Sequence, residues 1–171
     1  IDTPQRVLVM HARTGSSIAH ALVHGAKYIA AIEPYRPLVS LLRENLASAT
    51  DSLLYNPHVS VHAMDPRTFL LSDTSSYDLI SLPLLDSFGG TAGLYAVQEQ
   101  YTLTKEAFSE MWNRLTPNGT ISVSSWMDYP FRNPLKLLAT LVEVLESAGV
   151  RDPVRNIAAV RSWGTITFVA K

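Results

Sequence analysis

Acidic side chains follow three of the short apolar runs in this chain, each at or near the point where the run ends. Glu33 follows "YIAAI", Asp65 follows "VSVHAM", and Asp86 follows "YDLISLPLL". In a parallel sheet the carboxyl ends of the strands meet at one edge, where open α/β proteins bind their ligands. The spacing therefore predicts a binding site whose hydrogen-bond acceptors are carboxylates.

Glu33 carries the strongest of these signals. It lies about twenty residues beyond the first turn, where an acidic side chain accepts hydrogen bonds from the ribose hydroxyls of a dinucleotide or adenosyl ligand. A carboxylate suits this role because it accepts two donors at once through charge-assisted bonds. The alternative is structural, with Glu33 capping the helix that starts in "EPYRP". We favour ribose binding.

The other two carboxylates each allow a binding role and a local structural role. Asp65 either accepts a hydrogen bond from an adenine amino group or caps the helix beginning at Pro66, since aspartate before proline is a common helix start. Asp86 lies where a reacting group would meet a bound cofactor. Its structural alternative is a turn aspartate ahead of Gly89 and Gly90.

The first turn, "HARTGSS", carries side chains where a nucleotide-binding loop usually has glycine. His11 and Arg13 occupy these positions, and Gly15 remains. Glycine is used there because it lets the backbone turn freely and approach the ligand. His11 and Arg13 either narrow the pocket, or Arg13 points to solvent or offers its cation to a ligand carboxylate. We predict that Gly15 and Arg13 contact the cofactor and that Thr14 caps the following helix.

Short apolar runs alternate with segments of helical period, as in strands and crossover helices of a mostly parallel sheet. Helices are expected at 14–25, 35–47, 67–71, 104–114 and 134–148, with a turn at "TPNG"; strands are expected at 6–10, 28–32, 59–63, 77–82, 120–125, 156–161 and 165–170. The short "SWG" connection makes the last two strands an antiparallel hairpin. We predict a single α/β domain with a Rossmann-like class I methyltransferase fold. Its seven-stranded sheet is mostly parallel, with the antiparallel hairpin at the C-terminus and helices on both faces.

Composition limits the partners of this 171-residue chain. The net charge of -1 lacks the basic excess that nucleic-acid binding needs. No apolar run approaches the roughly 20 residues that span a bilayer, so we expect a soluble domain. The absence of cysteine fits a reducing, cytoplasmic compartment, and the histidines lack the spacing of metal ligands. Because Ile1 is not an initiator methionine, we expect a domain cut from a longer chain.

Four longer stretches resemble the catalytic domain of spermidine synthases: "YNPHVSVHAMDPRTFL", "YDLISLPLLDSFGGTAGLYAVQEQYTLTKEAF", "LTPNG" and "IAAVRSWGTITFVAK". They are most similar to large bacterial proteins in which such a domain follows a multi-span membrane region. The resemblance implies an adenosyl co-substrate, S-adenosylmethionine or its decarboxylated form, with Glu33 at the ribose and Asp65 beside the adenine. It also implies aminopropyl or methyl transfer to a small amine acceptor, and it is compatible with a homodimer.

The sequence departs from the spermidine synthase pattern at the reaction centre. The synthases have an aspartate, two small residues and a second aspartate after the fourth strand, whereas this chain has "PLLD". Asp86 matches the second aspartate, and Pro83 replaces the first, which is expected to take a proton from the attacking amine. Two hypotheses follow. The chain is a transferase with Asp86 near the acceptor, or a non-catalytic adenosyl-sensing or protein-interaction domain that keeps the fold.

Overall fold

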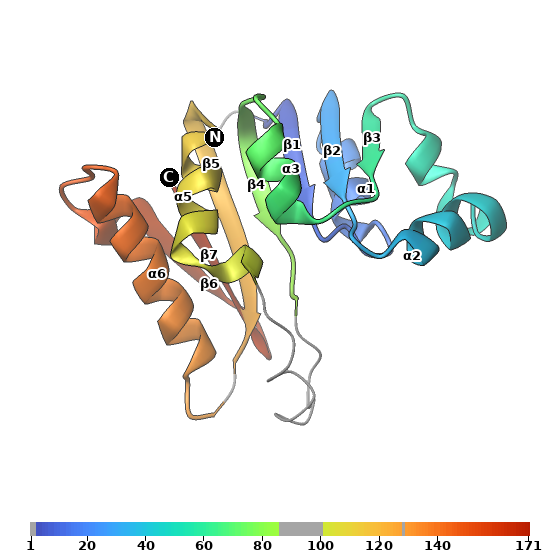
Figure 1. Cartoon of the computed structure of the whole chain (residues 1–171). Coiled ribbons are helices and arrows are strands. Elements are labelled where there is room, and N and C mark those ends of the chain that lie inside the picture. Colours follow the sequence, from blue (N-terminus) through green and yellow to red (C-terminus); the bar gives the residue numbers. More distant parts are fainter. Residues whose placement is uncertain (1–2, 86–100, 128) are drawn as a thin grey trace.

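One mixed sheet forms the centre of the molecule. The computed structural model describes residues 3–85, 101–127 and 129–171. Within these residues seven strands follow the order β3-β2-β1-β4-β5-β7-β6 (Figure 1). The first five strands are parallel, and β7 runs antiparallel to both β5 and β6, which confirms the predicted C-terminal hairpin. The strands are β1 (Arg6–Met10), β2 (Tyr28–Ile32), β3 (Val59–His62), β4 (Tyr77–Leu82), β5 (Leu115–Trp126), β6 (Ile157–Arg161) and β7 (Thr165–Ala170).

Helices cover both faces of the sheet, as predicted. One face carries α3, α5 and α6, which stand in front of the strands in Figure 1, and the other carries α1 and α2. Strand β1 contributes to a core on each side: Leu8 and Met10 pack on the α3 side, and Val7 and Val9 on the α1 side. The helices are α1 (Ser16–Val23), α2 (Arg36–Ser40), α3 (Pro66–Ser72), α5 (Lys105–Asn113) and α6 (Asn133–Ser147). No helix in the described ranges has the length and apolar character needed to cross a membrane.

Helix α1 is shorter than the predicted range 14–25. The residue before it is Gly15, which has a φ of 94° and no side-chain capping bond, so the prediction that Thr14 caps the helix is wrong. The predicted end is correct. Gly25 has a φ of 83°, and the following Ala26 N–H donates to the Ala21 carbonyl, a bond typical of a helix closed by a left-handed glycine.

The predicted helix at 35–47 is divided into two segments. Helix α2 passes into a π-helical turn at Leu41–Asn45, in which the Leu46 N–H donates to the Leu41 carbonyl at 3.0 Å. The wider turn rotates the apolar stripe. Leu42 is buried, but Leu41 and Leu46 are exposed, although a regular α-helix over 35–47 would place Leu38, Leu41, Leu42 and Leu46 on one inner face. A π-turn adds one residue per turn, so a stripe predicted with the α-helical period loses its register.

A turn outside the sheet was predicted at "TPNG". The structure instead includes this segment in β5. Tyr77 pairs with Leu115, whereas Leu79 pairs with Thr120, so residues 116–119 bulge out of the ladder. Gly119 is required at this bulge because an added Cβ would lie 2.7 Å from the Tyr77 carbonyl oxygen. The turn-forming residues are therefore used to bend a strand, which begins at Leu115 rather than at residue 120.

Candidate functional site

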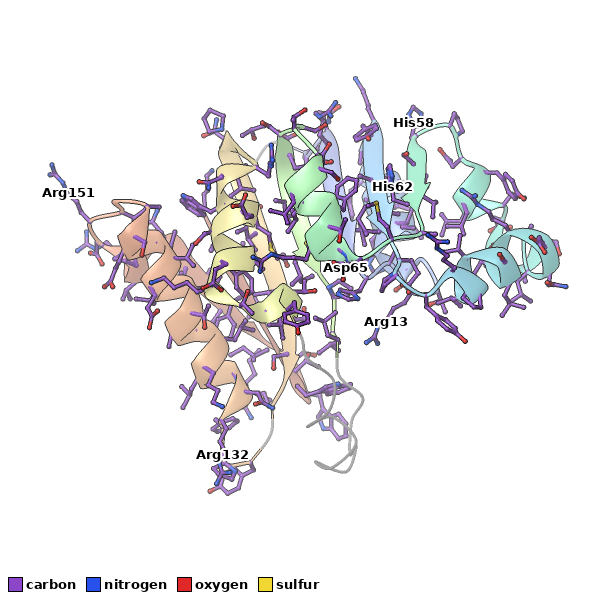
Figure 2. All side chains as sticks on the ribbon, in the orientation of Figure 1. Arg13, His58, His62, Asp65, Arg132 and Arg151 are labelled. Atoms are coloured by element: carbon purple, nitrogen blue, oxygen red, sulfur yellow. The ribbon has the colours of Figure 1, made fainter. Side chains whose placement is uncertain are left out.

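The carboxyl ends of β1 to β4 lie side by side and carry the predicted site residues. Because these strands pair in parallel, the segments that follow them meet at one edge of the sheet. Figure 2 shows Arg13 and Asp65 near this edge, with His58 toward the opposite end. The expectation that the first, second and third loops come together is confirmed.

Glu33 forms a bridge between two segments at this edge. Its side chain is only 5% exposed. One carboxylate oxygen accepts the Arg13 backbone N–H at 2.7 Å, and the other accepts the Tyr35 N–H at 2.9 Å, just before α2. Glu33 therefore fixes the segment before α2, but the predicted capping of the helix is not observed, because α2 has no side-chain capping bond. A carboxylate offers about four acceptor positions, so two backbone donors leave capacity for the ribose hydroxyls of an adenosyl ligand.

The first turn keeps a glycine-type backbone although it carries side chains. His11 has a φ of 55° and Arg13 a φ of 49°, in the left-handed region that non-glycine residues rarely adopt. The Ala12 N–H donates to the Ile32 carbonyl at 2.9 Å, which ties the turn to the end of β2. The turn thus uses the left-handed backbone conformations that glycine adopts without strain, as predicted for a loop that usually carries glycine.

Both side chains leave the turn toward segments much later in the sequence. The His11 imidazole hydrogen-bonds to the Thr102 hydroxyl at 3.1 Å, and Thr102 is buried. The Arg13 guanidinium donates to the Leu85 carbonyl, just beyond β4. Burial lowers the pKa of His11 below its ordinary value, against the opposing attraction of Glu33, so the imidazole is neutral at neutral pH.

Asp65 caps α3, which confirms its structural interpretation. Its carboxylate accepts the Thr68 backbone N–H at 2.9 Å and the Thr68 hydroxyl at 3.3 Å, and α3 begins at Pro66. The side chain is exposed at the binding edge, and hydrogen bonding to adenine stays a prediction. Asp86, the predicted group near the acceptor, lies outside the described residues.

A cavity of about 300 Å³ opens beside the end of β4, and the sequence analysis did not predict it. Its walls come from the end of β4, the 3₁₀ turn η4 (Tyr101–Leu103), the carboxyl end of β5 and the start of α6. Within the described part of the chain, the lining residues are Leu85, Leu103, Ser124, Ser125, Asn133, Lys136, Leu137 and Thr140. The sequence does carry a signal for it: the predicted strand at 120–125 is parallel to its neighbour β4, so the segment that follows it reaches the same edge.

The first turn is physically connected to this cavity. Arg13 binds the carbonyl of Leu85, which lines the cavity, and His11 binds Thr102, which adjoins the lining residue Leu103. Arg67 of α3 donates to the Thr104 hydroxyl at 2.9 Å and so fixes the segment after η4. A ligand held at the first turn would therefore lie next to the cavity walls.

The fold places the chain in a known structural class. No protein family model matches the chain. Human methyltransferase-like protein 13 in complex with SAH shares its fold, with a TM-score of 0.64 and 14% identity over 98% of this chain and 72% of that chain. Spermidine synthase from Thermotoga maritima gives a TM-score of 0.63 and 15% identity, over 98% and 54% of the two chains. The chain has the Rossmann-like class I S-adenosylmethionine methyltransferase fold.

Sequence comparison narrows the relationship. Polyamine aminopropyltransferase 2 of Pseudomonas aeruginosa is 26% identical over 125 residues, which cover 71% of this chain and 34% of that protein. The chain is spermidine synthase-like, a distant homologue of the polyamine aminopropyltransferases, which confirms the resemblance drawn from the sequence. The matched regions span 34% to 36% of the length of the curated relatives.

Proposed function

We propose that this chain binds an adenosyl sulfonium, S-adenosylmethionine or its decarboxylated form, and transfers a methyl or aminopropyl group to a small amine acceptor. The observation that carries the proposal is the position of Glu33. Its buried carboxylate is fixed by two backbone donors directly beside the first turn and keeps acceptor capacity for a ribose. Distant homology to polyamine aminopropyltransferases supports the same chemistry.

The proposed roles of Asp65, Gly15 and Arg13 follow from their places at the edge, and that of Asp86 follows from the sequence resemblance alone. Asp65 accepts from the adenine amino group, Gly15 and Arg13 border the ligand at the first turn, and Asp86 lies near the acceptor. The sulfonium supplies an activated carbon: the amine lone pair forms the new C–N bond, the C–S electron pair stays on sulfur as a thioether, and the amine proton leaves. Pro83 has no group that accepts this proton, so it passes to Asp86 or to water.

Calorimetric titration with S-adenosylmethionine, its decarboxylated form and methylthioadenosine tests the site. We expect Glu33→Gln to weaken the binding of all three by about tenfold or more, because a charged acceptor is lost. Glu146→Gln, on the exposed end of α6, makes the same change away from the edge and should bind as the parent does. Asp65→Asn tests the proposed hydrogen bond to the adenine amino group. It keeps the cap of α3, because asparagine is as favourable as aspartate at a helix N-cap.

The outcomes separate the parts of this proposal. If the parent bound none of the three ligands, the proposed function would be wrong. If it bound them and Glu33→Gln bound equally well, the assignment of Glu33 to the ribose would be wrong. Melting temperatures measured on the same samples distinguish lost binding from lost folding, which matters because Glu33 also holds the first turn.

A non-catalytic adenosyl-binding domain is a second candidate. The observation that favours it is Pro83, which stands directly after β4 where the synthases have their proton acceptor. Such a domain would bind the ligands above but release no methylthioadenosine or S-adenosylhomocysteine in the presence of amines. Chromatographic measurement of these two thioether products therefore decides between the candidates.

A further inference from the structure

The cavity beside β4 has a specific chemical character. Its apolar wall consists of leucines and its polar wall of hydroxyl groups, with Asn133 at the start of α6. Among the described lining residues, Lys136 is the one with a charged side chain. A volume of about 300 Å³ lies at the lower end of the range for small-molecule sites. The cavity therefore suits a short ligand with an apolar middle and at least one polar end.

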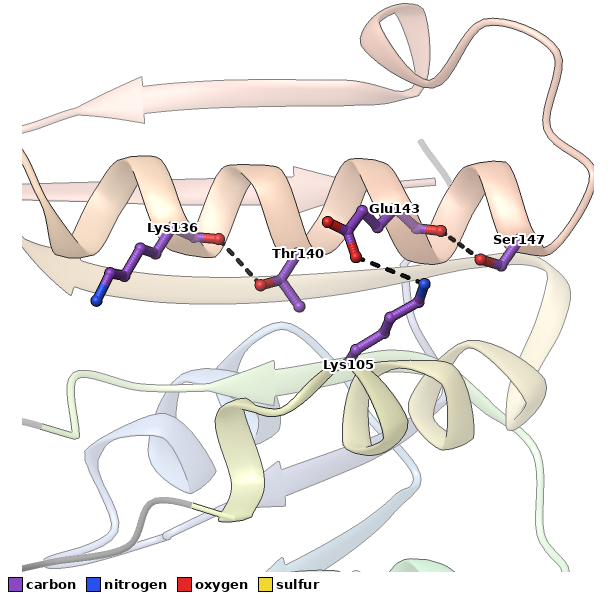
Figure 3. A network of polar contacts seen from close by, with 5 residues as sticks. All are labelled: Lys105, Lys136, Thr140, Glu143 and Ser147. Carbon is purple, nitrogen blue, oxygen red and sulfur yellow. Dashed lines mark hydrogen bonds and ion pairs between the residues drawn. The ribbon is translucent and has the colours of Figure 1, made fainter.

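The charge of Lys136 is not neutralised within the described part of the chain. No described carboxylate forms an ion pair with its ammonium group. Glu143, further along α6, is paired with Lys105 at 3.5 Å. Figure 3 shows the Lys136 side chain extending toward the amino-terminal end of α6, away from this pair. Lys136 is exposed and borders the cavity, so its ammonium is accessible to a ligand that enters there.

A second cation lies beside the lining residue Leu85. The Arg13 guanidinium is bound to the carbonyl of Leu85, so its positive charge stands beside the end of β4. Pro83, two residues earlier, contributes no carboxylate. A ligand with ammonium groups at both ends would bring one of them close to the Lys136 ammonium, and this repulsion is unfavourable even with partial screening by solvent.

We propose that this cavity binds the acceptor and that Lys136 recognises an anionic group on it, a carboxylate or a phosphate, at the end opposite the reacting amine. The acceptor is then a short zwitterion rather than a diamine. The assignment of this ligand as the acceptor substrate rests on the proposed transferase function. The recognition of an anionic group by Lys136 does not depend on that function. A charge-assisted bond to an ammonium group supplies both affinity and orientation, because it leaves the amine facing the first turn.

Three probes with a common amine test this selectivity: 4-aminobutanoate, 3-aminopropylphosphonate and 1,4-diaminobutane. Their affinities are measured by NMR titration of the whole chain. We expect at least one anionic probe to bind about tenfold more tightly than the diamine, and Lys136→Gln to abolish that advantage. Arg151→Gln is the matched control, because Figure 2 shows Arg151 beyond the opposite end of α6, and it should keep the preference. Comparison of the two anionic probes distinguishes a carboxylate from a phosphate ligand.

The proposal is overturned if the diamine binds best, if neither anionic probe binds, or if Lys136→Gln leaves the preference unchanged. Its failure is distinguishable from failure of the proposed function. Loss of adenosyl binding with Lys136-dependent binding of an anionic probe would refute the transferase and retain the anion site. Adenosyl binding that depends on Glu33, together with a preference for the diamine, would refute the anion site alone.

Discussion

Single residues set the character of the first turn. His11 and Arg13 adopt the left-handed conformation that glycine takes without strain, at positions where the sequence already showed glycine to be missing. That departure could be predicted from residue type alone. The destinations of the side chains could not, because His11 reaches Thr102, 91 residues away, and Arg13 reaches Leu85. Such contacts depend on how the whole sheet is assembled.

Gly15 has a left-handed backbone conformation and also little space for a side chain, and the energetic costs of these two features can be measured separately. Its φ is 94°, and an added Cβ would lie 2.6 Å from a Leu53 methyl group. Gly149 has a similar φ of 83° with no atom within 4 Å of that position. We expect Gly149→Ala to lower the free energy of unfolding by about 1–2 kcal/mol, the left-handed penalty alone, and Gly15→Ala to lower it further. Urea unfolding measures both, and equal losses would show that Leu53 moves aside freely.

His11 is expected to make stability depend on pH. Burial lowers its pKa in the folded state below the unfolded value of 6.5, with Arg13 acting in the same direction and Glu33 and Asp65 opposing. The unfolded chain therefore binds more protons in this window. The contribution of His11 is complete above about pH 6.5 and is lost as the pH falls toward its folded pKa. Urea unfolding at pH 7.5 and 5.5 should show a smaller acid loss in His11→Gln than in the parent, and equal losses would contradict the assignment.

At the scale of elements, the strands were predicted better than the helix ends. Strands β1 and β2 are buried on both faces, so their unbroken apolar runs identify them without any periodicity. The π-turn after α2 and the bulge in β5 were not predicted, because each departs from the regular period on which the expectation rests. Asp65 and Pro66 marked the start of α3 correctly, since capping is a local property of neighbouring residues.

Asp78 holds three elements together at the amino end of the sheet. Its carboxylate accepts the N–H groups of Gln5 and Arg6 and the hydroxyl of Thr116, each at 2.9 Å. Partial burial alone would raise the pKa of Asp78, but these hydrogen bonds outweigh it and lower the pKa below 3.8. The carboxylate thus fixes the start of β1 and the bulge of β5 to β4.

Removal of one of these hydrogen bonds tests their contribution. We expect Thr116→Val to reduce the free energy of unfolding by about 1 kcal/mol, the usual net contribution of one such hydrogen bond. Asp78→Ala should reduce it more, because the two backbone N–H donors also lose their acceptor. The stabilisation should be present above about pH 3.8 and decline as the pH falls through the lowered pKa. Chemical denaturation of the two variants at pH 7 measures the difference, and an unchanged Asp78→Ala would show that water replaces the carboxylate.

At the scale of the whole molecule, the parallel order of the strands decides where chemistry can occur. The alternation of runs predicted the parallel direction of these strands, and with it the edge that carries both Glu33 and Asp65. It did not predict the neighbouring cavity, whose described walls come from four segments between Leu85 and Thr140 that only tertiary packing brings together. The candidate site therefore has a half that could be predicted from the sequence, for which we propose adenosyl binding, and a half that required the structure.

Pro83 lies between these two halves, and its replacement tests how they work together. Restoring a carboxylate there supplies a proton acceptor and an attraction for ammonium groups, which neither Arg13 nor Lys136 provides. We expect Pro83→Asp to raise aminopropyl transfer from decarboxylated S-adenosylmethionine to 1,4-diaminobutane by up to about 10²–10⁴-fold, the usual range for a positioned general base. Pro83→Asn is the matched control, because asparagine has nearly the same size as aspartate and its introduction also removes the proline ring. It should give no such increase in transfer. Equal rates for the two variants, measured as methylthioadenosine released, would mean that the missing carboxylate is not what limits transfer in this chain.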